Sequence, residues 1–469
     1  MRKTKIVCTI GPASNSFEML RALIDAGMNV ARLNFSHGTR EGHAETFARI
    51  RQLSEDCGRQ IAVLQDLPGR KLRTGEMAAP VELESGQPFS FLAEEVAGDN
   101  IRVTLPHPEL FSEVSKGSSI FVDDAHLEFR VTNADRNEIK TEVVTGGELS
   151  SRKGVVIPGA RPAGPGVTEQ DIVDLKFGLE LGVDWVASSF VRQAGDAEPI
   201  RQTMRELDKY AMLMAKVERP EAMENIDEII GAYDGIMVAR GDLGIEIPIH
   251  EVPVAQKQII QKCNAAGKPV ITATEMLDSM IRNPRPTRAE VVDVANAVFD
   301  GTDATMLSGE TAIGKYPLQA VEMMSKVAVS TEKVLNYPQM LRERVSAKAE
   351  TITDAIGQAA SEIAEDLEAP VIVTCTATGT SARLVSKYRP RARIVAAASR
   401  PETVRQLQLS WGIESVAVPP AENTDQMISI AVNTAKYCGY VKGGETVVVI
   451  AGVPVGAPGN TSLVRVVTA

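Results

Sequence analysis

The sequence predicts an α/β protein: a (β/α)₈ (TIM) barrel, an all-β lid domain inserted after the third barrel strand, and a C-terminal open α/β domain. Three observations support this prediction. Short apolar runs alternate with amphipathic helical stretches, the alternation stops between Gly69 and about Pro158, and a second α/β unit follows the charged segment Arg342–Glu350. The chain of 469 residues is too long for one core. The predicted divisions are residues 1–69 and 159–341 for the barrel, 70–158 for the lid and 342–469 for the C-terminal domain.

Eight apolar runs of strand length predict the barrel strands. Each is followed by a stretch with helical spacing, such as Phe17 to Ala26, which stops at Gly27, or the stretch opened by Thr168. Repeated strand–helix units of this number are typical of a closed parallel barrel. The predicted strands are Lys5–Gly11, Asn29–Ser36, Gln60–Asp66, Trp185–Phe190, Ala211–Glu218, Gly235–Ala239, Pro269–Thr274 and Ala304–Ser308.

The insertion and the C-terminal unit differ in their patterns of apolar residues. The insertion has short alternating runs (Pro88–Leu92, Ser119–Asp123, Glu138–Val144) punctuated by Gly and Pro, without a convincing helix pattern, which predicts β structure. Arg342–Glu350 is interpreted as a linker helix or hinge. The C-terminal unit has predicted strands at Pro370–Thr374, Ile394–Ala398, Ser415–Val418, Thr446–Ala451 and Leu463–Val467. Its predicted helices are Thr353–Leu367, Ser381–Tyr388, Thr403–Trp411 and Asp425–Cys438.

Composition narrows the function classes. The net charge of −11 argues against a general nucleic-acid binder, although a basic pocket in an acidic protein can still bind a phosphorylated metabolite. Aromatic residues make up only 4%, which predicts aliphatic cores. No apolar run approaches the roughly twenty residues of a membrane helix. Met1–Val7 lacks a signal-peptide core, and the five scattered cysteines are interpreted as reduced core thiols of a cytoplasmic protein.

Polar residues collect where the predicted barrel strands end. In a parallel barrel these ends meet at one face, where enzymes of this fold build their chemistry. The sequence therefore predicts an active site there. The strand-end residues are Arg32, Asn34, Ser36, His37, Asp66, Ser189, Lys216, Glu218, Arg240, Gly241, Asp242, Thr274, Glu275, Ser308 and Glu310.

Glu218 and Asp242 are hard oxygen ligands at the ends of successive strands. Two carboxylates completed by water and substrate oxygens are the usual way to hold Mg²⁺, whereas zinc is disfavoured because His37 is the only His or Cys at these ends. Lys216 lies two residues before Glu218, so the two side chains share one strand face. A lysine beside a metal and a phosphate neutralises charge that develops during transfer. The alternative is a lysine in a salt bridge at the rim.

Other polar residues have two interpretations each. Arg32 and Arg73 could bind phosphates in bidentate fashion, although Arg73 could equally be a solvated linker residue. Lys153 could close on a nucleotide from a mobile lid or merely aid solubility. Thr274 could relay a proton or satisfy a local backbone group. Arg240 could be a substrate cation, or a salt bridge that shapes its loop.

Thr374–Ser381 joins a predicted strand to a predicted helix and is rich in hydroxyls. It is typical of a phosphate-binding turn, but it lacks the Lys of a P-loop. An N-cap formed by Thr380 explains the segment almost as well.

Long ordered segments of the chain are similar to those of one enzyme family. They are Thr4–Ser14, Asn29–Gly38, Ala215–Glu218, Met237–Pro248, Asn283–Glu290 and Met306–Thr311. On these segments the chain resembles pyruvate kinase along nearly its whole length.

The resemblance implies transfer of the phosphoryl group of phosphoenolpyruvate to ADP, giving pyruvate and ATP in the last step of glycolysis. It implies Glu218 and Asp242 as Mg²⁺ ligands, with Mn²⁺ as a substitute ion. Lys216 and Arg32 would contact the transferring group, and Thr274 would help to protonate the enolate, with a water network near Ser308 and Glu310. The implied substrate-binding residues are Ser189, Lys216, Gly241, Asp242 and Thr274, and the nucleotide-binding residues are Asn34, His37, Arg73 and Lys153.

The resemblance also implies a homotetramer, and an effector phosphate site at Thr376, Thr378, Gly379, Thr380 and Ser381. Many members bind K⁺ through positions matching Asn34, Ser36, Asp66 and Leu67, with a Glu nearby. Here Lys71 stands at the position of that Glu, and a fixed ammonium can supply the charge of a potassium ion, so we expect activity without K⁺. Two further departures are Arg70, where a Pro is usual, and Gly42, where some relatives carry an aromatic residue near the base. The departure at Arg70 leaves the hinge into the lid undetermined, and the departure at Gly42 leaves the contacts to the nucleotide base undetermined.

Two rival functions remain at this stage. A Mg²⁺-dependent aldolase or lyase on a similar barrel also binds enolates of pyruvate, but it does not explain the insertion or the C-terminal domain. A metabolite-binding regulatory protein without turnover is disfavoured by the intact set Lys216, Glu218, Asp242 and Thr274. The sequence leaves the effector open among a sugar bisphosphate, a sugar monophosphate, AMP or none.

Overall fold

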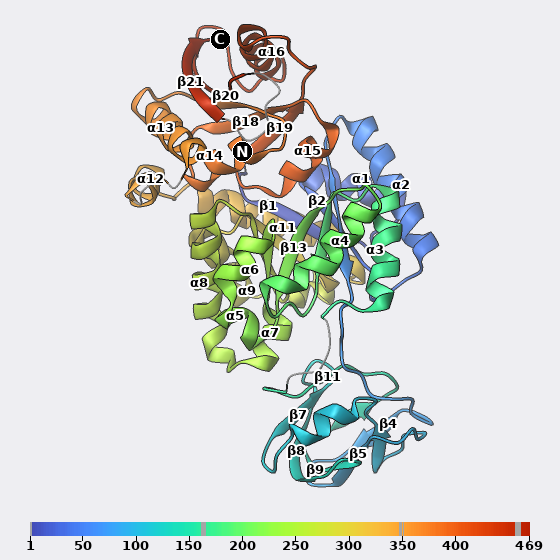
Figure 1. Ribbon diagram of the computed structural model, residues 1–469. Helices are drawn as coiled ribbons and strands as arrows, with labels where there is room; N and C mark the ends of the chain where they lie inside the picture. Colours follow the sequence, from blue (N-terminus) through green and yellow to red (C-terminus); the bar gives the residue numbers. More distant parts are fainter. Residues whose placement is uncertain (1, 161–165, 347–348, 350, 455–460) are drawn as a thin grey trace.

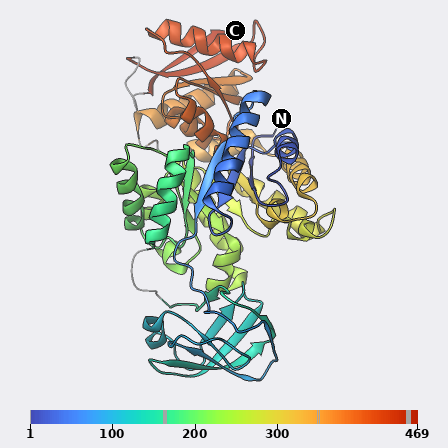
Figure 2. The ribbon, with the colours of Figure 1, turned by 90° about the vertical axis from the view of Figure 1, so that its right-hand side faces the viewer.

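The computed structural model describes residues 2–160, 166–346, 349, 351–454 and 461–469. Three units lie along one axis, with a barrel in the middle (Figure 1). The inserted β-unit hangs from one end of the barrel and the C-terminal domain covers the other end, and the quarter-turn view shows the same arrangement (Figure 2).

The barrel is closed by parallel strands in the order β1-β16-β15-β14-β13-β12-β3-β2. Their bounds are β1 Lys5–Thr9, β2 Val30–Asn34, β3 Ala62–Leu67, β12 Trp185–Ser188, β13 Met212–Val217, β14 Gly235–Ala239, β15 Val270–Ala273 and β16 Ala304–Leu307. The predicted barrel is confirmed, with each strand inside or within one residue of its predicted run. β3 pairs with β12 although the β-unit separates them in sequence, and β1 closes the ring against β16.

Helices follow the strands around the outside of the barrel (Figure 1). Capping residues fix several ends: Thr168 forms a capping box with Asp171 at the start of α3, and Gly182 ends that helix at φ +84°. The bounds are α1 Phe17–Ala26, α2 Arg40–Cys57, α3 Glu169–Leu181, α4 Glu198–Glu206, α5 Pro220–Glu224, α6 Ile226–Ala232, α7 Arg240–Glu246, α8 Val252–Ala266, α9 Arg288–Asp300, α10 Gly309–Ala312 and α11 Pro317–Glu332. The next helix, α12 Tyr337–Val345, lies beside α13 (Ile352–Asp366) of the C-terminal domain.

Two cores stabilise the barrel because its strands are buried on both faces. One core lies between strands and helices and contains Leu23, Ile50 and Ile259. The other fills the barrel with side chains such as Met214, Met237 and Trp185. Both are largely aliphatic, as the composition predicts.

The inserted unit is a sheet in the order β11-β7-β8-β9-β5-β6 beside the pair β10-β4. The strands are β4 Val81–Leu83, β5 Pro88–Leu92, β6 Arg102–Thr104, β7 Ser119–Val122, β8 Leu127–Ala134, β9 Glu138–Thr145, β10 Gly147–Leu149 and β11 Val155–Val156, and a short 3₁₀ turn spans Pro108–Ser112. Its core is also mostly aliphatic, but it has an aromatic centre that the composition did not predict. Phe89, Phe91 and Phe129 form mutual ring contacts of 5.1–5.5 Å there.

The C-terminal domain has one sheet in the order β19-β18-β17-β20-β21, of which β21 is antiparallel. The strands are β17 Val371–Thr376, β18 Arg393–Ala398, β19 Ile413–Ala417, β20 Thr446–Gly452 and β21 Thr461–Thr468. The helices are α13 Ile352–Asp366, α14 Thr380–Lys387, α15 Pro401–Gln406 and α16 Thr424–Tyr437. Buried residues of α13 and α14 pack on one face of the sheet and those of α16 on the other, which confirms an open α/β domain.

The predicted helix Thr403–Trp411 is wrong in its second half. The helix ends at Gln406, and residues 407–409 form a 3₁₀ turn. The chain leaves the helix because Leu409 belongs to the core inside the barrel, and Trp185 donates to the carbonyl of Gln406 at 3.1 Å. This turn joins the C-terminal domain to the N-terminal ends of the barrel strands.

The cysteine interpretation is partly wrong. All five cysteines are free and Cys8, Cys263 and Cys375 are buried, but Cys57 is partly exposed and Cys438 is exposed. None of the helices in the described ranges has both the length and the apolarity needed to cross a membrane.

Candidate active site

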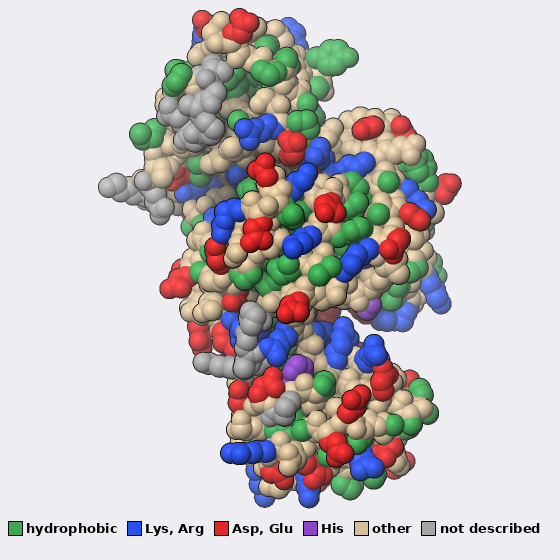
Figure 3. Space-filling view, turned by 45° about the vertical axis from the view of Figure 1, so that its right-hand side comes forward, with side chains coloured by type: hydrophobic (Ala, Val, Ile, Leu, Met, Phe, Trp, Pro, Cys, Tyr) green, Lys and Arg blue, Asp and Glu red, His purple; other side chains and the backbone are tan. Residues whose placement is uncertain are grey.

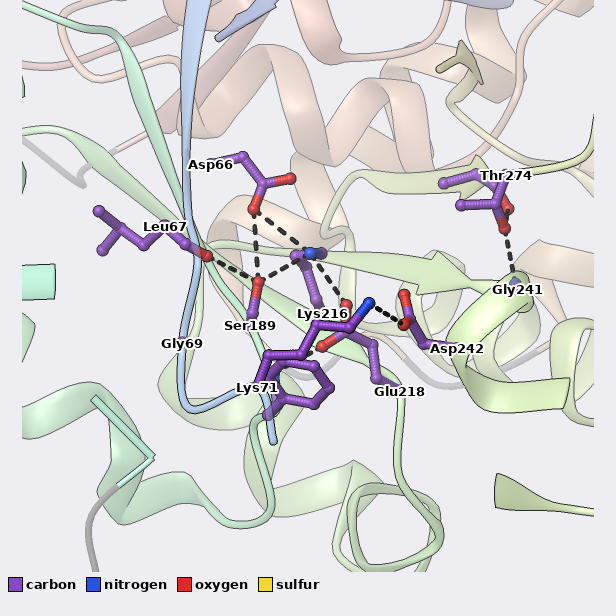
Figure 4. A network of polar contacts seen from close by, with 12 residues as sticks. Asp66, Leu67, Gly69, Lys71, Ser189, Lys216, Glu218, Gly241, Asp242 and Thr274 are labelled. Atoms are coloured by element: carbon purple, nitrogen blue, oxygen red, sulfur yellow. Dashed lines mark hydrogen bonds and ion pairs between the residues drawn. The ribbon is translucent and has the colours of Figure 1, made fainter. Parts of the chain in front are cut away.

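Lys216 is the centre of the predicted site. Its Nζ donates to Ser189 Oγ at 2.7 Å and lies 2.9 Å from Glu218 Oε1 and 3.3 Å from Asp66 Oδ1 (Figure 4). Ser189 Oγ in turn donates to the Leu67 carbonyl at 2.7 Å. Burial alone would lower the pKa of Lys216, but Asp66 and Glu218 raise it, so the ammonium stays charged. The alternative of a rim salt bridge is thus half right: the bridges exist, but Lys216 is only 9% exposed.

Glu218 is a buried carboxylate held at both oxygens. Oε1 faces Lys216, and Oε2 accepts from the Phe190 backbone N–H at 2.6 Å. Burial and the negative charge of Asp242 raise the pKa of Glu218, Lys216 lowers it, and the net value is about 7. The two carboxylates therefore repel each other, and a cation between them would relieve that repulsion.

Asp242 lies in the first turn of α7, directly after β14. Its Oδ1 is 3.8 Å from Lys71 Nζ, which also lies 3.3 Å from Asp124 Oδ1 in the β-unit (Figure 4). A recess of about 420 Å³ between barrel and β-unit is lined by Glu218, Asp242 and Lys71, among others. Within the described ranges no three or more His, Cys, Asp or Glu side chains are grouped to hold a metal ion. Two hard carboxylates fit Mg²⁺, which takes its remaining ligands from water and substrate.

Arg32 and Asp66 face each other from β2 and β3. Arg32 Nε donates to Asp66 Oδ2 at 2.7 Å, and its Nη1 donates to Thr9 Oγ1 at 2.8 Å. Burial would raise the pKa of Asp66, but Lys216 and Arg32 lower it, so this carboxylate is ionised. Arg32 is thereby fixed beside the Lys216 cluster.

Thr274 lies across the mouth, at the end of β15. Its Oγ1 accepts from the Gly241 N–H at 2.7 Å and donates to the Ala273 carbonyl at 2.6 Å (Figure 4). Thr274 and Glu275 both have left-handed φ, at +68° and +56°, and such backbone strain clusters at functional sites. The N–H of Gly241, one of the implied substrate-binding residues, is thus bonded to Thr274.

Arg240 supports this loop from behind. It donates to the Thr274 carbonyl at 2.7 Å and pairs with Asp293 at 2.8 Å, the loop-shaping role that was its second interpretation. Glu310 accepts from the N–H groups of Leu277 and Ser308, at 3.0 and 2.7 Å, and ties two strand-end loops together.

The predicted nucleotide residues lie farther out. A recess of about 800 Å³ is lined by Arg73 and Ser36 together with Phe35, Gly38, Thr39, Arg40, His43, Pro68, Gln170 and Asp174. His37 is exposed beside it and accepts from His43 Nε2 through its carbonyl at 2.9 Å, and Asn34 Oδ1 accepts from the Ser36 N–H at 3.1 Å. Lys and Arg side chains gather around the narrow waist between barrel and β-unit (Figure 3). Lys153 lies on the β-unit, paired with Asp123 at 2.9 Å.

The turn before α14 differs from its simpler interpretation. The N-cap is Gly379, at φ +82°, and not Thr380, so the N-cap alternative is wrong. The hydroxyls serve the turn instead: Thr376 Oγ1 accepts from the Gly379 N–H at 2.9 Å, and those of Thr378 and Thr380 are 3.0 Å apart. Ser381 pairs with Thr461 at 2.5 Å.

The sequence analysis missed a buried ion pair beside Glu218 and Asp242. Arg219 Nη1 lies 3.2 Å from Glu246 Oε1, and Arg219 Nη2 donates to the Ala160 carbonyl at 2.6 Å, where the chain returns from the β-unit. Burial raises the pKa of Glu246 to about 7, against the opposite effect of Arg219. The available signal was position: Arg219 directly follows Glu218, and Glu246 closes the helix that begins at Arg240. The Arg40–Asp174 pair, at 2.8 Å in the outer recess, was missed as well.

Comparison with known proteins decides the family. The model of the pyruvate kinase barrel domain matches residues 1–321, and that of the pyruvate kinase alpha/beta domain matches residues 354–467. The chain belongs to the pyruvate kinase family. It is therefore a phosphotransferase, and its barrel with a C-terminal α/β domain is the pyruvate kinase fold.

Individual pyruvate kinases are similar over the whole chain. The enzyme of Geobacillus stearothermophilus is 48% identical over 469 residues, and that of Bacillus licheniformis is 47% identical over 470; each alignment covers 99% of this chain and 80% of the relative. The crystal structure of a pyruvate kinase from Cryptosporidium parvum superimposes with a TM-score of 0.94 at 38% identity, over 100% of this chain and 96% of that one.

Proposed function

We propose that this member of the pyruvate kinase family transfers the phosphoryl group of phosphoenolpyruvate to ADP, giving pyruvate and ATP in the last step of glycolysis. The observation that carries the proposal is the cluster of Lys216, Glu218 and Asp242 at the carboxyl ends of adjacent barrel strands. Atoms balance as follows: the bond from the enol oxygen to phosphorus breaks, a bond from ADP to phosphorus forms, and the enolate takes up one proton at carbon.

Each active-site residue has its own role in the proposed reaction. Glu218 and Asp242 would hold Mg²⁺ (or Mn²⁺), which when bound supplies positive charge to the phosphoryl oxygens. Lys216 and Arg32 would add fixed positive charge at the same group, Lys216 with its orientation set by Ser189 and Asp66. Thr274 would deliver the proton to the enolate, and Ser189, Gly241 and Asp242 would bind the substrate.

The outer recess is the proposed nucleotide site. Arg73 lines it, and Asn34, His37 and Lys153 would contact the nucleotide from outside its lining. The β-unit would act as a lid, since Arg73 and Lys153 lie on the two neighbouring segments that lead into and out of it. We keep the domain limits 1–69, 70–158, 159–341 and 342–469 as a proposal. A cytoplasmic homotetramer, and an effector phosphate at Thr376, Thr378, Gly379, Thr380 and Ser381, are proposed on family grounds alone.

The proposal is tested by coupling ATP formation to an indicator enzyme. Purified protein with phosphoenolpyruvate, ADP and Mg²⁺ should form ATP and pyruvate in equal amounts, and a chelator should abolish both. Release of pyruvate without ATP would favour the lyase alternative and refute the proposal.

Activity without K⁺ is the second part of the proposal. Lys71 Nζ lies against Asp242 and Asp124, and its ammonium would add the positive charge that K⁺ supplies in other members. Turnover should change little when K⁺ is replaced by tetramethylammonium, and Lys71→Glu should make turnover K⁺-dependent. Loss of most wild-type activity without K⁺ would contradict this part.

A further inference from the structure

A second polar recess lies at the opposite end of the barrel from the active site. It measures about 210 Å³ and separates the N-terminal ends of the barrel strands from the C-terminal domain. The barrel contributes Asn264, Gly267, Lys268, Pro269 and Asp303, and the C-terminal domain contributes Arg383, Ser386, Lys387, Arg389 and Ser410. Arg383, Ser386 and Lys387 have the i, i+3, i+4 spacing of one face of α14.

The lining is strongly cationic. It contains four cations and only one carboxylate, Asp303. Three cations have close partners: Arg389 with Asp303 at 3.1 Å, Lys387 with Asp354 at 2.9 Å, and Lys268 with backbone carbonyls. Arg383 has only long hydrogen bonds, at 3.3 Å to the Thr378 carbonyl and 3.4 Å to Thr380 Oγ1. Asp303 and Asp354 therefore neutralise two of the four cations, and Asp234 acts on the other two, Arg383 and Lys268, from outside the lining.

Three buried polar atoms of this one recess lack a hydrogen-bond partner among the described residues. They are Ser410 Oγ, Arg389 Nε and Arg383 Nη1. Ser410 and Arg389 are each only 2% exposed. Because at least nine in ten buried polar groups are paired, three unpaired donors around one space call for a water, an ion or a ligand. Burial also lowers the pKa of Arg383, an effect that a nearby anion would oppose.

We propose that this recess binds a small tetrahedral oxyanion, either inorganic phosphate or the phosphoryl group of a small metabolite. Guanidinium groups at Arg383 and Arg389 match phosphate oxygens, and Ser410 adds a neutral donor. Since the walls of the recess come from both domains, the anion would join them.

This site is separate from the proposed effector turn and from the active site. None of the five proposed effector residues lines the recess. Arg383 lies one helical turn along α14 from that turn and bonds to Thr378 and Thr380, so it contacts both regions. Variants in the recess can therefore be compared with intact active-site and effector-turn residues.

Two measurements on the full chain test the site. Crystals soaked in sodium selenate should give an anomalous peak among Arg383, Arg389 and Ser410. In solution, inorganic phosphate should raise the unfolding midpoint above that in chloride at equal ionic strength. Phosphate at the active site contributes equally in wild type and variants. Because Arg383 also bonds to the effector turn, the variant at Ser410 is the one that isolates the recess. Glycerol phosphate in a parallel arm distinguishes a phosphoryl group on a metabolite from the free ion.

Arg383→Gln should raise the half-saturating phosphate concentration by about tenfold or more, since a charge-assisted hydrogen bond is lost. Ser410→Ala, which removes one buried oxygen without adding bulk, should weaken it several-fold and guards against misfolding of the first variant. Arg391→Gln is the matched control: its side chain is 59% exposed and paired with Glu365, and it should bind like wild type. Density for water alone in selenate-soaked crystals, or equal phosphate protection in wild type and both recess variants, would overturn the proposal.

Discussion

Lys216 is oriented by groups from three strand ends. Its ammonium is surrounded by Ser189, Asp66 and Glu218, so it has little rotational freedom and a constant charge. Such fixed charge costs no reorganisation when the phosphoryl group is transferred. Glu218 contacts Lys216, and the nearby charge of Asp242 raises its pKa.

Replacing Lys216 separates catalysis from binding. Lys216→Met keeps the length of the side chain and removes its charge, and we expect kcat to fall by roughly 10²-fold or more with a much smaller change in the KM for phosphoenolpyruvate. Steady-state kinetics at saturating Mg²⁺ measure both. Turnover equal to that of wild type would refute the role given to Lys216.

Glu246 gives a prediction for stability against pH. Its folded pKa of about 7 exceeds the usual value of 4.5, so the folded chain binds more protons than the unfolded chain between these values. Stability from this residue is therefore greatest below about pH 4.5 and is lost as pH rises through 7, by up to about 3 kcal/mol. Glu246→Gln mimics the protonated form and should flatten that decline.

Unfolding midpoints at pH 5 and pH 8 check this expectation. The variant should match wild type at pH 5 and lose less stability at pH 8. Glu224→Gln, which alters an exposed carboxylate at the end of α5, is the matched control and should keep the wild-type slope. A variant slope as steep as that of wild type would contradict the prediction.

For the individual residues of the site, position in the chain predicted more of the observed contacts than residue type did. The strand-end rule brought Lys216, Glu218, Asp66 and Ser189 to one point, because parallel strands end together. The second interpretation of Thr274, as a residue that satisfies a local backbone group, is confirmed by its bond to the Ala273 carbonyl. Its bond to the Gly241 N–H was not foreseen, since that contact needs a left-handed backbone that no residue type there demands. The Arg219–Glu246 pair escaped because it depends on how α7 packs.

The 3₁₀ turn after α15 is an element with a structural role that its sequence does not announce. Leu409 is fully buried in the barrel interior although it belongs to the C-terminal domain. Periodicity from Thr403 to Trp411 suggested a continuous helix, and only the presence of the barrel end explains why the chain turns. The strands and helices elsewhere were predictable because their burial follows a regular period.

Shortening the Leu409 side chain should lower the free energy of unfolding. Leu409→Ala leaves a cavity at the bottom of the barrel, and we expect a loss of about 2–5 kcal/mol in the free energy of unfolding. Leu367→Ala, at a side chain that is 50% exposed, serves as control and should change stability by no more than about 0.5 kcal/mol. Denaturant titrations of wild type, Leu409→Ala and Leu367→Ala measure these changes in the free energy of unfolding. A small effect at Leu409 would mean that the barrel end closes without it.

Across the whole molecule, Arg389 links barrel and C-terminal domain. It is 2% exposed, pairs with Asp303 at 3.1 Å through two nitrogens, and donates to the Gly301 carbonyl at 2.9 Å. Arg389→Met would leave Asp303 buried without its cation, and we expect a loss of about 3–5 kcal/mol. Calorimetry should show a lower midpoint or a separate transition for the C-terminal domain. Arg391→Met breaks only the exposed pair with Glu365 and should cost at most about 1 kcal/mol; equal effects of the two changes would contradict this account.

The pairing of β1 with β16 also has a consequence for synthesis. Lys5 pairs with Ala304, so the ring cannot close until some 300 residues have been translated. At about 5–20 residues per second, the ribosome needs roughly 15–60 s to reach that point. During this time the nascent sheet has open edges that can pair with other chains. The β-unit, whose strands pair only with one another, can finish folding first. Newly made chains are therefore most exposed to aggregation before residue 304 emerges, and chaperone binding during translation should concentrate on that interval.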